Sequence, residues 1–491
     1  MPVSPAYRPD PRHLALGEAF YDPVAPSPFP AAVTRWRNDR WAARVGLDTL
    51  DDAEWVAHMA RFAPLPDNLP EPLALRYHGH QFQSYNPDLG DGRGFLYAQM
   101  RDVEDGRLLD LGTKGSGQTP YSRFGDGRLT LKGGVREILA TEMLEALGVY
   151  TSKSLSLVET GEALMRNDEP SPTRASVLVR LSHTHIRVGS FQRLLFLNEG
   201  AALEKLVAYC LETYHPQAPA YENPAVALLA AVTEAVAKMG AEWFQAGFVH
   251  GVLNTDNIAI TGESFDYGPW RFLPELDTGF TAAYFDQTGL YAFGRQPAAL
   301  HWNLCRLADC LRHLADQEAL VAALELFGEV FDAHLSRLTR ARLALDPDDD
   351  GAADAPAFFY RALARTKLPF ERAFFDLAGG ADPERLAGSP HADAYAGPDW
   401  AEAIAAIRAA RAHPRRDEAL AHPYFSRAAP VTMLIDEVEA IWRPIAAGDD
   451  WGAFSAKIAE VGEMRGAYGV LLEGVGRGLA HPHAVGIGSD L

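Results

Sequence analysis

Apolar residues in the second half of the chain recur every three or four positions, a spacing that predicts helices with one packed face. The most regular stretch runs from Glu204 to Gln245, and Asn223 and Pro224 within it are suited to cap and begin a helix. The apolar stripe that follows consists of Leu229, Val232, Val236, Met239 and Trp243. Similar stripes from Leu300 to Leu314 and from Leu434 to Trp442 predict further core helices, the second of them the last in the chain.

The first half contains shorter apolar runs bounded by Gly, Asp and Pro, which predict strands. The expected strands are Phe95 to Met100, Leu108 to Lys114, Ser154 to Glu159 and Ser176 to Leu181. Gly133 to Glu137 opens a helix between the second and third of them, and Glu137 is expected in its first turn. The residues before about Leu69 are rich in Pro and Trp, with short helical stretches such as Asp51 to Arg61.

These elements predict an α+β protein in three parts. Residues 1–76 form an N-terminal extension that wraps the core, residues 77–200 form a strand-rich part, and residues 201–491 form a largely helical part. A length of 491 residues exceeds that of one typical core, which agrees with such a division. Two hydrophilic breaks, at 346–351 and 378–399, are expected to be loops between helices.

Composition narrows the possible partners and the location. With 47% hydrophobic and 22% charged residues the chain has the make-up of a globular protein, and its net charge of −20 argues against a nucleic-acid partner. There is no run of eighteen apolar residues and no basic segment followed by an apolar core at the start, so we expect no membrane association and no secretion. Three cysteines are too few for a disulfide framework, and we expect a cytoplasmic protein.

The candidate chemistry centres on the run HGVLNTDN at residues 250–257 and on Asp266-Tyr267-Gly268 shortly after it. A carboxylate next to a carboxamide, with a second carboxylate before an aromatic residue and Gly, is how kinase-like folds build a base and a Mg²⁺ site. Asp256 can accept a proton, while Asn257 and Asp266 offer the oxygen ligands that Mg²⁺ prefers. The base of related small-molecule kinases usually follows the His-Gly pair directly, but Val252 holds that place here.

Further residues suit the binding of a polyphosphate. Gly90 and Gly92 would let backbone N–H groups approach phosphate oxygens closely. Lys114, on the strand after the glycine-rich hairpin, would hold the phosphates, and Glu137 would pair with Lys114 and fix its position. Arg180 and Arg187 would face opposite ways on one strand, but a turn between them could bring both to the same phosphates. Together these features indicate a nucleotide-dependent transferase.

With these residues in view, the chain resembles the selenoprotein O family of pseudokinase-fold protein adenylyltransferases. The resemblance extends from about Tyr77 to Leu307 and rests on YHGHQF, LGDGRG, KGSGQTPYSRFGDGR, the Glu137 helix, VRLSHTHIRVGSFQ, HGVLNTDN and DYGPWRFL. It implies a bilobal protein-kinase-like fold and transfer of AMP from ATP to Ser, Thr or Tyr hydroxyls of proteins. Asp256 would be the catalytic base, Asn257 and Asp266 the Mg²⁺ ligands, and Glu137 the support of Lys114. The implied ATP-binding residues are Gly90, Gly92, Arg93, Lys114, Asp126, Gly127, Arg180, Arg187 and Asp266.

Two departures and three alternatives accompany this resemblance. The sequence ends in HAVGIGSDL, without the cysteine or selenocysteine of many family members, so we expect no redox control through that tail. The loop after Asp277 differs in sequence from the loop usual in the family, so the resemblance does not indicate how the protein acceptor is recognised. The same chemical groups would also serve an ordinary phosphotransferase, transfer of UMP with Mn²⁺, or a nucleotide-binding pseudokinase without catalysis.

Overall fold

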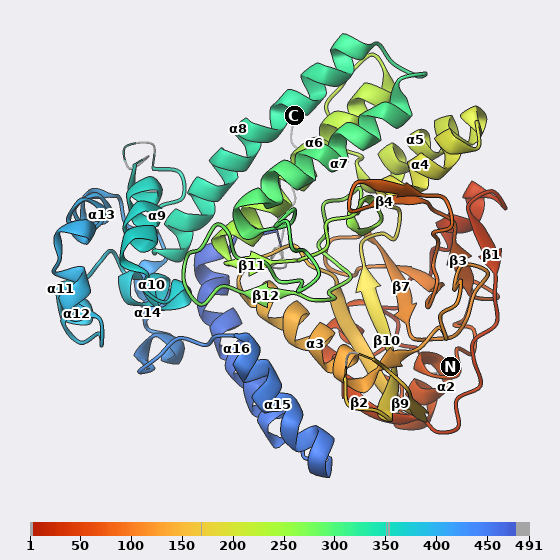
Figure 1. The fold of residues 1–491 in the computed structure, drawn as a ribbon, viewed down its shortest axis with the longest axis horizontal. Coiled ribbons are helices and arrows are strands. Elements are labelled where there is room, and N and C mark those ends of the chain that lie inside the picture. Colours follow the sequence, from red (N-terminus) through yellow and green to blue (C-terminus); the bar gives the residue numbers. More distant parts are fainter. Residues whose placement is uncertain (1–2, 168, 350, 352–353, 478–491) are drawn as a thin grey trace, which may run out of the picture.

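The computed structural model of the chain describes residues 3–167, 169–349, 351 and 354–477. The fold is a mixed α+β arrangement in which an antiparallel sheet, formed in the first part of the chain, adjoins a large helical region (Figure 1). The C-terminal run HAVGIGSDL, for which the sequence predicts no redox role, lies outside the described residues.

The sheet runs in the order β1-β3-β6-β7-β10-β9-β2, with β8 pairing on β10, and every pairing in it is antiparallel. Its strands are β1 (Tyr21–Pro23), β2 (Val33–Arg37), β3 (Leu73–Leu75), β6 (Leu96–Arg101), β7 (Leu108–Lys114), β8 (Leu129–Thr130), β9 (Lys153–Leu164) and β10 (Thr173–Ser182). Two small sheets pair β4 (Gly79–Gln81) with β5 (Ser84–Asn86), and β11 (Phe248–Val249) with β12 (Arg271–Phe272). The first part of the chain therefore supplies strands to the main sheet as well as covering it.

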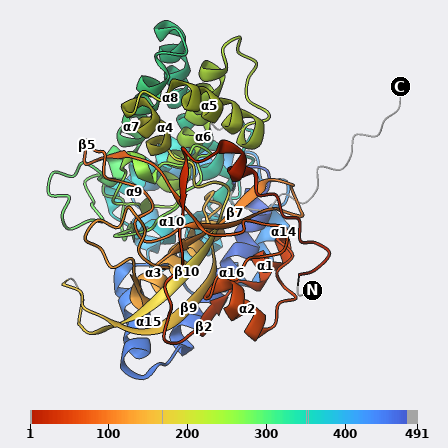
Figure 2. The ribbon, with the colours of Figure 1, turned by 90° about the vertical axis from the view of Figure 1, so that its right-hand side faces the viewer.

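Helices cover both faces of the sheet and form most of the remainder of the molecule (Figures 1 and 2). They are α1 (Asp39–Arg44), α2 (Asp52–Met59), α3 (Leu131–Ala146), α4 (Val188–Phe196), α5 (Gly200–Tyr214), α6 (Pro224–Gln245), α7 (Gln296–Leu311), α8 (Gln317–Arg342), α9 (Ala355–Thr366), α10 (Phe370–Leu377), α11 (Pro383–Ala387), α12 (Ala392–Tyr395), α13 (Pro398–Ala409), α14 (Arg416–Leu420), α15 (Ile435–Gly448) and α16 (Gly452–Leu472). The three long helices α6, α7 and α8 pack together, as Figure 1 shows.

Alternation along β10 divides the apolar core between the two faces of the sheet. Val177 and Val179 pack with Trp41 and Trp55 of the N-terminal helices, whereas Leu178 packs in the larger core with α3 and α6. Successive strand residues point to opposite faces, so one strand serves both cores. The sheet is thereby buried on both sides and forms a rigid support for residues at the strand ends.

Among the described helices, α6 alone is long and apolar enough to cross a membrane by length and composition. Its most apolar window is 78% buried inside the protein. The predicted cap is present, because the Asn223 side chain accepts hydrogen bonds from the N–H groups of Ala225 and Val226. The apolar surface of α6 is therefore packing surface, covered by neighbouring helices.

Several sequence predictions differ from the structure. The helix from Leu434 is not the last, because α16 follows it; three glycines at 462, 466 and 469 interrupt its apolar pattern, and glycine usually breaks helices. The break at 378–399 contains the short helices α11 and α12. The helix bearing Glu137 begins at Leu131, where the Thr130 hydroxyl caps the Gly133 N–H, so Glu137 lies in the second turn.

Candidate active site

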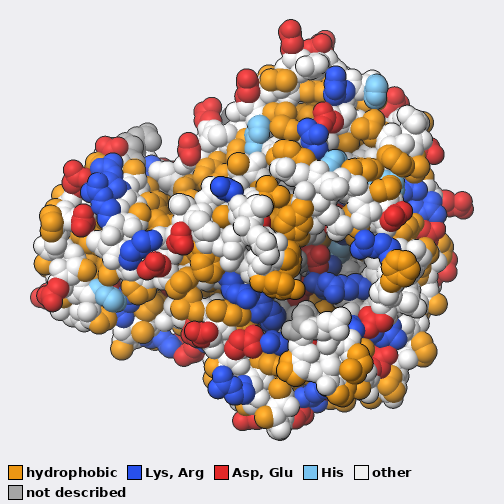
Figure 3. All heavy atoms as spheres, in the orientation of Figure 1, with side chains coloured by type: hydrophobic (Ala, Val, Ile, Leu, Met, Phe, Trp, Pro, Cys, Tyr) orange, Lys and Arg blue, Asp and Glu red, His pale blue; other side chains and the backbone are white. Residues whose placement is uncertain are grey.

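A cavity of about 650 Å³ lies where the glycine-rich turn before β6, the end of β7, the β10–α4 turn and the loop after β11 meet. Figure 3 shows a hollow on this face of the molecule with Lys and Arg side chains gathered around it. Ten of the residues predicted from the sequence line the cavity: Gly90, Gly92, Arg93, Lys114, Asp126, Gly127, Arg180, Arg187, Asp256 and Asp266. Glu137 lies behind Lys114, and Asn257 is not among the lining residues.

Lys114 is the central cation of this cavity. Its ammonium pairs with Glu137, which is 1% exposed, and lies 2.8 Å from the Asp266 carboxylate. Arg180 also reaches Asp266, at 3.1 Å, because Leu178 lies opposite Lys114 in the β7–β10 register and Arg180 is two residues further along the same face. Burial alone would raise the pKa of Asp266, but Lys114 and Arg180 hold it well below its usual range. Asp266 is therefore ionised at neutral pH.

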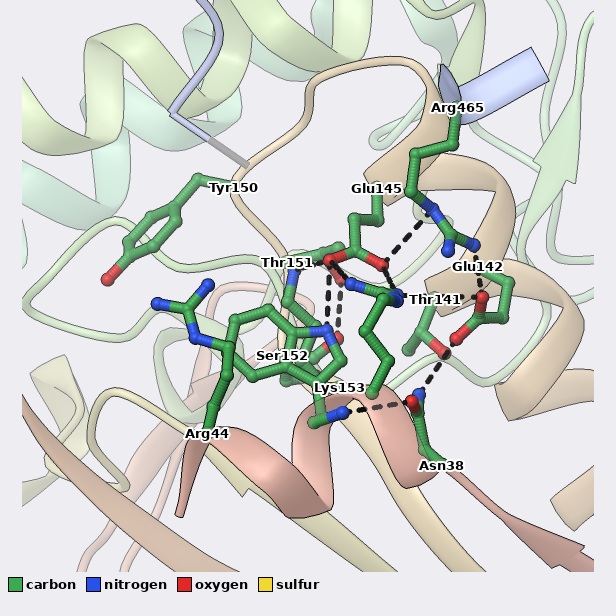
Figure 4. Close-up of polar contacts among 12 residues, drawn as sticks. Asn38, Arg44, Thr141, Glu142, Glu145, Tyr150, Thr151, Ser152, Lys153 and Arg465 are labelled. Atoms are coloured by element: carbon green, nitrogen blue, oxygen red, sulfur yellow. Dashed lines mark hydrogen bonds and ion pairs between the residues drawn. The ribbon is translucent and has the colours of Figure 1, made fainter. Parts of the chain in front are cut away.

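Helix α3, which carries Glu137, is fixed by a buried ionic network on its opposite end (Figure 4). Glu145 is contacted by Lys153 at 3.3 Å, by the Trp41 indole N–H at 3.0 Å and by Arg40. Glu142, one turn earlier on α3, pairs with Arg465 of α16 and accepts a hydrogen bond from Asn38 at 3.0 Å. The start of the chain, the sheet and the last helix thus all hold α3 in place.

The two carboxylates of this network differ, and we expect Glu145→Gln to lower the free energy of unfolding by about 3 kcal/mol and Glu142→Gln by less than about 1 kcal/mol. Burial would raise the pKa of Glu145, but Lys153 and Arg40 hold it far below its usual range, so the carboxylate is needed. Burial raises the pKa of Glu142 despite Arg465, so the folded protein gains less from a charge at this position than from the charge of Glu145. Urea unfolding at neutral pH measures both values, and equal losses would contradict this assignment.

Arg187 links the two sides of the cavity. Its guanidinium lies over the rings of Tyr77 and Phe265, 4.2 and 5.1 Å from their centroids, and donates a hydrogen bond to the Asp256 carbonyl at 3.0 Å. It is 4% exposed, and the Asp91 carboxylate lies 3.6 Å away. The turn predicted between Arg180 and Arg187 is present, and both side chains point into the same cavity.

Asp256 lies in a short 3₁₀ turn, Thr255–Asn257, that neighbouring side chains hold in place. The Thr255 hydroxyl accepts a hydrogen bond from the His80 N–H at 2.7 Å, and Asn254 accepts one from the Phe82 N–H at 3.0 Å. Asp256 Oδ1 is buried and has no hydrogen-bond partner within the described part of the chain. Burial raises the pKa of Asp256 to about 6, although Arg187 opposes the shift. An unpartnered carboxylate oxygen with this pKa is suited to accept a proton near neutral pH.

Close approach of the glycine-rich turns explains two of the predicted glycines. A Cβ on Gly90 would lie 2.3 Å from the Tyr121 ring, and one on Gly127 would lie 2.3 Å from the backbone of Gly117. Gly127 also has a φ of +69°, in the left-handed region that favours glycine. These turns therefore pack against each other at one side of the cavity.

Asn257 and Asp266 are the candidate metal ligands. The described residues contain no group of three His, Cys, Asp or Glu side chains that could hold a metal ion by themselves. Asn257 donates its amide nitrogen to the Val252 carbonyl at 3.1 Å, which leaves its amide oxygen available. One carboxylate and one amide oxygen fit Mg²⁺ that takes its other ligands from phosphate and water, as Mg²⁺ usually does with nucleotides.

The structure adds cavity residues that the sequence did not reveal. Arg123 and Arg166 both line the cavity, and Arg166 pairs there with Asp126 at 2.8 Å. Arg123 has a φ of +53° and lies in the loop between Tyr121 and Gly127, within the run KGSGQTPYSRFGDGR. Arg166 lies between β9 and β10, far from every motif, so no local pattern indicates it.

Comparison with known proteins places this geometry in a family. A family model described as "Protein adenylyltransferase SelO" matches residues 6–461. A "Protein nucleotidyltransferase YdiU" of Synechocystis sp. is 42% identical over 91% of this chain and 96% of its own length. A protein of the same description from Vibrio cholerae is 39% identical over 75% of this chain and 74% of its own length. The chain therefore belongs to the SelO family of protein adenylyltransferases.

Proposed function

We propose that this protein transfers AMP from ATP to Ser, Thr or Tyr hydroxyl groups of protein acceptors and releases pyrophosphate. Membership of the SelO family supports an enzyme that transfers a nucleotide to protein. We further propose a kinase-like bilobal layout, in which residues 77–200 and 201–491 form the two lobes and residues 1–76 an extension of the first.

The observation that carries this proposal is that cations and a free carboxylate oxygen line one cavity. Arg93, Lys114 and Arg180 line it from the sheet part of the chain, and Asp256, whose Oδ1 has no hydrogen-bond partner among the described residues, lines it from the loop after β11. A triphosphate held by the cations would place a phosphorus atom between them and Asp256. The acceptor oxygen forms a bond to the α-phosphorus, the bond to the β-phosphate oxygen breaks, and Asp256 takes the hydroxyl proton.

Other residues of the chain orient this reaction. Arg187 fixes the Asp256 backbone and faces the cavity, so it contributes positive charge where negative charge grows on the leaving pyrophosphate. Asn257 and Asp266 would hold Mg²⁺, which when bound neutralises phosphate charge. Glu137 keeps Lys114 in position from behind the cavity.

Incubation with ATP labelled at either the α- or the γ-phosphate tests the proposed reaction. We expect the α label, and not the γ label, to become attached to the acceptor protein, with pyrophosphate as the second product. Retention of the γ label would instead identify an ordinary phosphotransferase. Competition between ATP and UTP, with Mg²⁺ or Mn²⁺, measures which nucleotide the cavity prefers.

The pKa of Asp256 predicts the pH dependence of the reaction. Because this carboxyl titrates near pH 6 and acts in its ionised form, kcat/KM is expected to rise about tenfold per pH unit below about pH 6 and to level off above it. Initial rates of AMP transfer across this range measure the profile. A flat profile between about pH 5 and pH 7 would remove Asp256 as the proton acceptor.

A further inference from the structure

A second hollow, of about 460 Å³, adjoins the nucleotide cavity. The two share Arg93, Lys114, Arg128 and Arg166 as a common wall. We call the part beyond that wall the cationic groove, defined by Lys132, Arg136, Gly268, Arg271, Tyr284 and Phe285. Basic residues dominate it although the chain as a whole has a net charge of −20.

Arg136 and Arg271 are two neighbouring guanidinium groups without a carboxylate partner among the described residues. Arg136 lies over the Trp270 ring at 4.9 Å and donates hydrogen bonds to the Gly268 and Trp270 carbonyls at 3.3 Å. Arg271 donates to the Pro269 and Trp270 carbonyls at 2.7 and 2.8 Å. The shared backbone segment therefore holds both cations in place without neutralising either.

The positive charges of Arg136 and Arg271 are not compensated by a paired carboxylate within the described part of the chain and favour a bound anion. Burial, followed by repulsion from Arg271, lowers the pKa of Arg136 to about 10. The nearby Glu439 carboxylate lies 2.8 Å from the Lys132 ammonium and is engaged there. Both arginines are only partly buried, so an external anion can reach them.

The cationic groove also leads toward the reacting atoms. Gly268 follows Asp266 by two residues, and nothing lies within 4 Å of where its Cβ would be. At the other end, the Phe285 ring is 5.9 Å from that of Phe82, whose N–H is bonded to Asn254, two residues before Asp256. Tyr284 and Phe285 are 85% and 47% exposed there, which leaves aromatic surface open to a partner.

We propose that the cationic groove binds an acidic segment of the protein acceptor, adjacent to the hydroxyl that is modified. This inference rests on the proposed function, because it assigns the acceptor's place at the same site. Acidic side chains would meet Arg136 and Arg271, while residues beside them would lie on Tyr284 and Phe285. The strongly acidic remainder of the chain would repel such a segment, so the groove also fixes where it binds.

Equilibrium binding tests the proposal on the full chain loaded with an ATP analogue that cannot be cleaved between its α- and β-phosphates. The probe is a fluorescein-labelled peptide of Glu and Gly around one Ser, compared with the same peptide carrying Gln in place of Glu. Fluorescence polarisation is expected to show at least about tenfold tighter binding of the Glu peptide, weakening as salt is added. The combined variant Arg136→Glu/Arg271→Glu is expected to abolish that preference.

Two further variants separate charge from folding. Arg271→Gln removes one charge with little change of size and is expected to lower the preference severalfold, whereas Arg361→Glu on the exposed face of α9 is expected to leave it unchanged. Thermal unfolding verifies that each variant is folded. The Kd for the ATP analogue is expected to stay within about threefold of the original value, because neither Arg136 nor Arg271 lines the nucleotide cavity.

Equal affinity for the Glu and Gln peptides would overturn the proposal. So would variants that weaken binding of the ATP analogue and leave peptide preference intact, because the groove would then serve the nucleotide or pyrophosphate. Because the measurement is of binding, failure of the α-phosphate label to reach any acceptor would be a separate result, and it would refute the proposed function itself.

Discussion

Asp256→Asn is expected to lower kcat for AMP transfer at least about 1000-fold, with the Kd for ATP changed less than about threefold. The amide has the size of the carboxyl group but cannot accept the hydroxyl proton. The turn around it is held by Thr255 and Asn254 and not by the Asp256 side chain, so the cavity keeps its shape. Single-turnover transfer of an α-phosphate label, together with ATP titration, measures both quantities.

The same substitution is expected to stabilise the folded protein at neutral pH. An ordinary Asp titrates near 3.8 and Asp256 near 6, so ionising it in the folded state costs up to about 3 kcal/mol. That cost is absent below about pH 4 and complete above about pH 7, so the variant's gain should appear only as pH rises. Asp332→Asn on the exposed side of α8 is the control, and full activity in Asp256→Asn would exclude the proposed base.

Lys114→Met is expected to abolish detectable transfer and to lower the free energy of unfolding by about 3 kcal/mol. Methionine fills the space but leaves Glu137 buried without its cation, and Asp266 loses one of its two partners. ATP binding is expected to weaken at least about tenfold, because the central cation facing the phosphates is gone. Transfer of an α-phosphate label, urea unfolding and ATP titration measure the three effects.

A combined variant separates the loss of stability from the loss of transfer activity. Lys114→Met/Glu137→Gln removes both members of the buried pair, so most of the lost stability should return while transfer stays absent. Recovery of both stability and transfer would show that Lys114 acts only by neutralising Glu137. Failure to recover stability would mean that another contact, such as Lys114 with Asp266, dominates.

The sequence was sufficient to predict the strand that ends at Lys114, and it indicated that a turn could bring Arg180 and Arg187 together, which agrees with both side chains lining one cavity. Leu108 to Lys114 alternates between two covered faces, and the polar turn at 183–187 interrupts the strand that carries Arg180. The ten predicted residues that line one cavity come from motifs that are continuous in the chain.

Most of the remaining features depend on contacts between distant segments. The second-turn position of Glu137 depends on the cap supplied by Thr130, and α16 forms despite its glycines because α3 and the neighbouring helices cover it. Arg166 reaches the cavity only because β9 and β10 pair over their full length. Of these, only the Thr130 cap has a local signal, because a Thr directly before a helix commonly caps it; the other two arrangements depend on segments that are distant in the chain.

The positions of β1 and β2 at opposite edges of the main sheet have a consequence for biosynthesis. Their partners β3 and β9 are made later, and β9 ends only at Leu164. During translation β2 therefore remains unpaired until more than a hundred further residues have been made and β9 can pair with it. Until then β2 lacks its partner β9, and an unpaired strand of this kind is where nascent chains associate wrongly with one another.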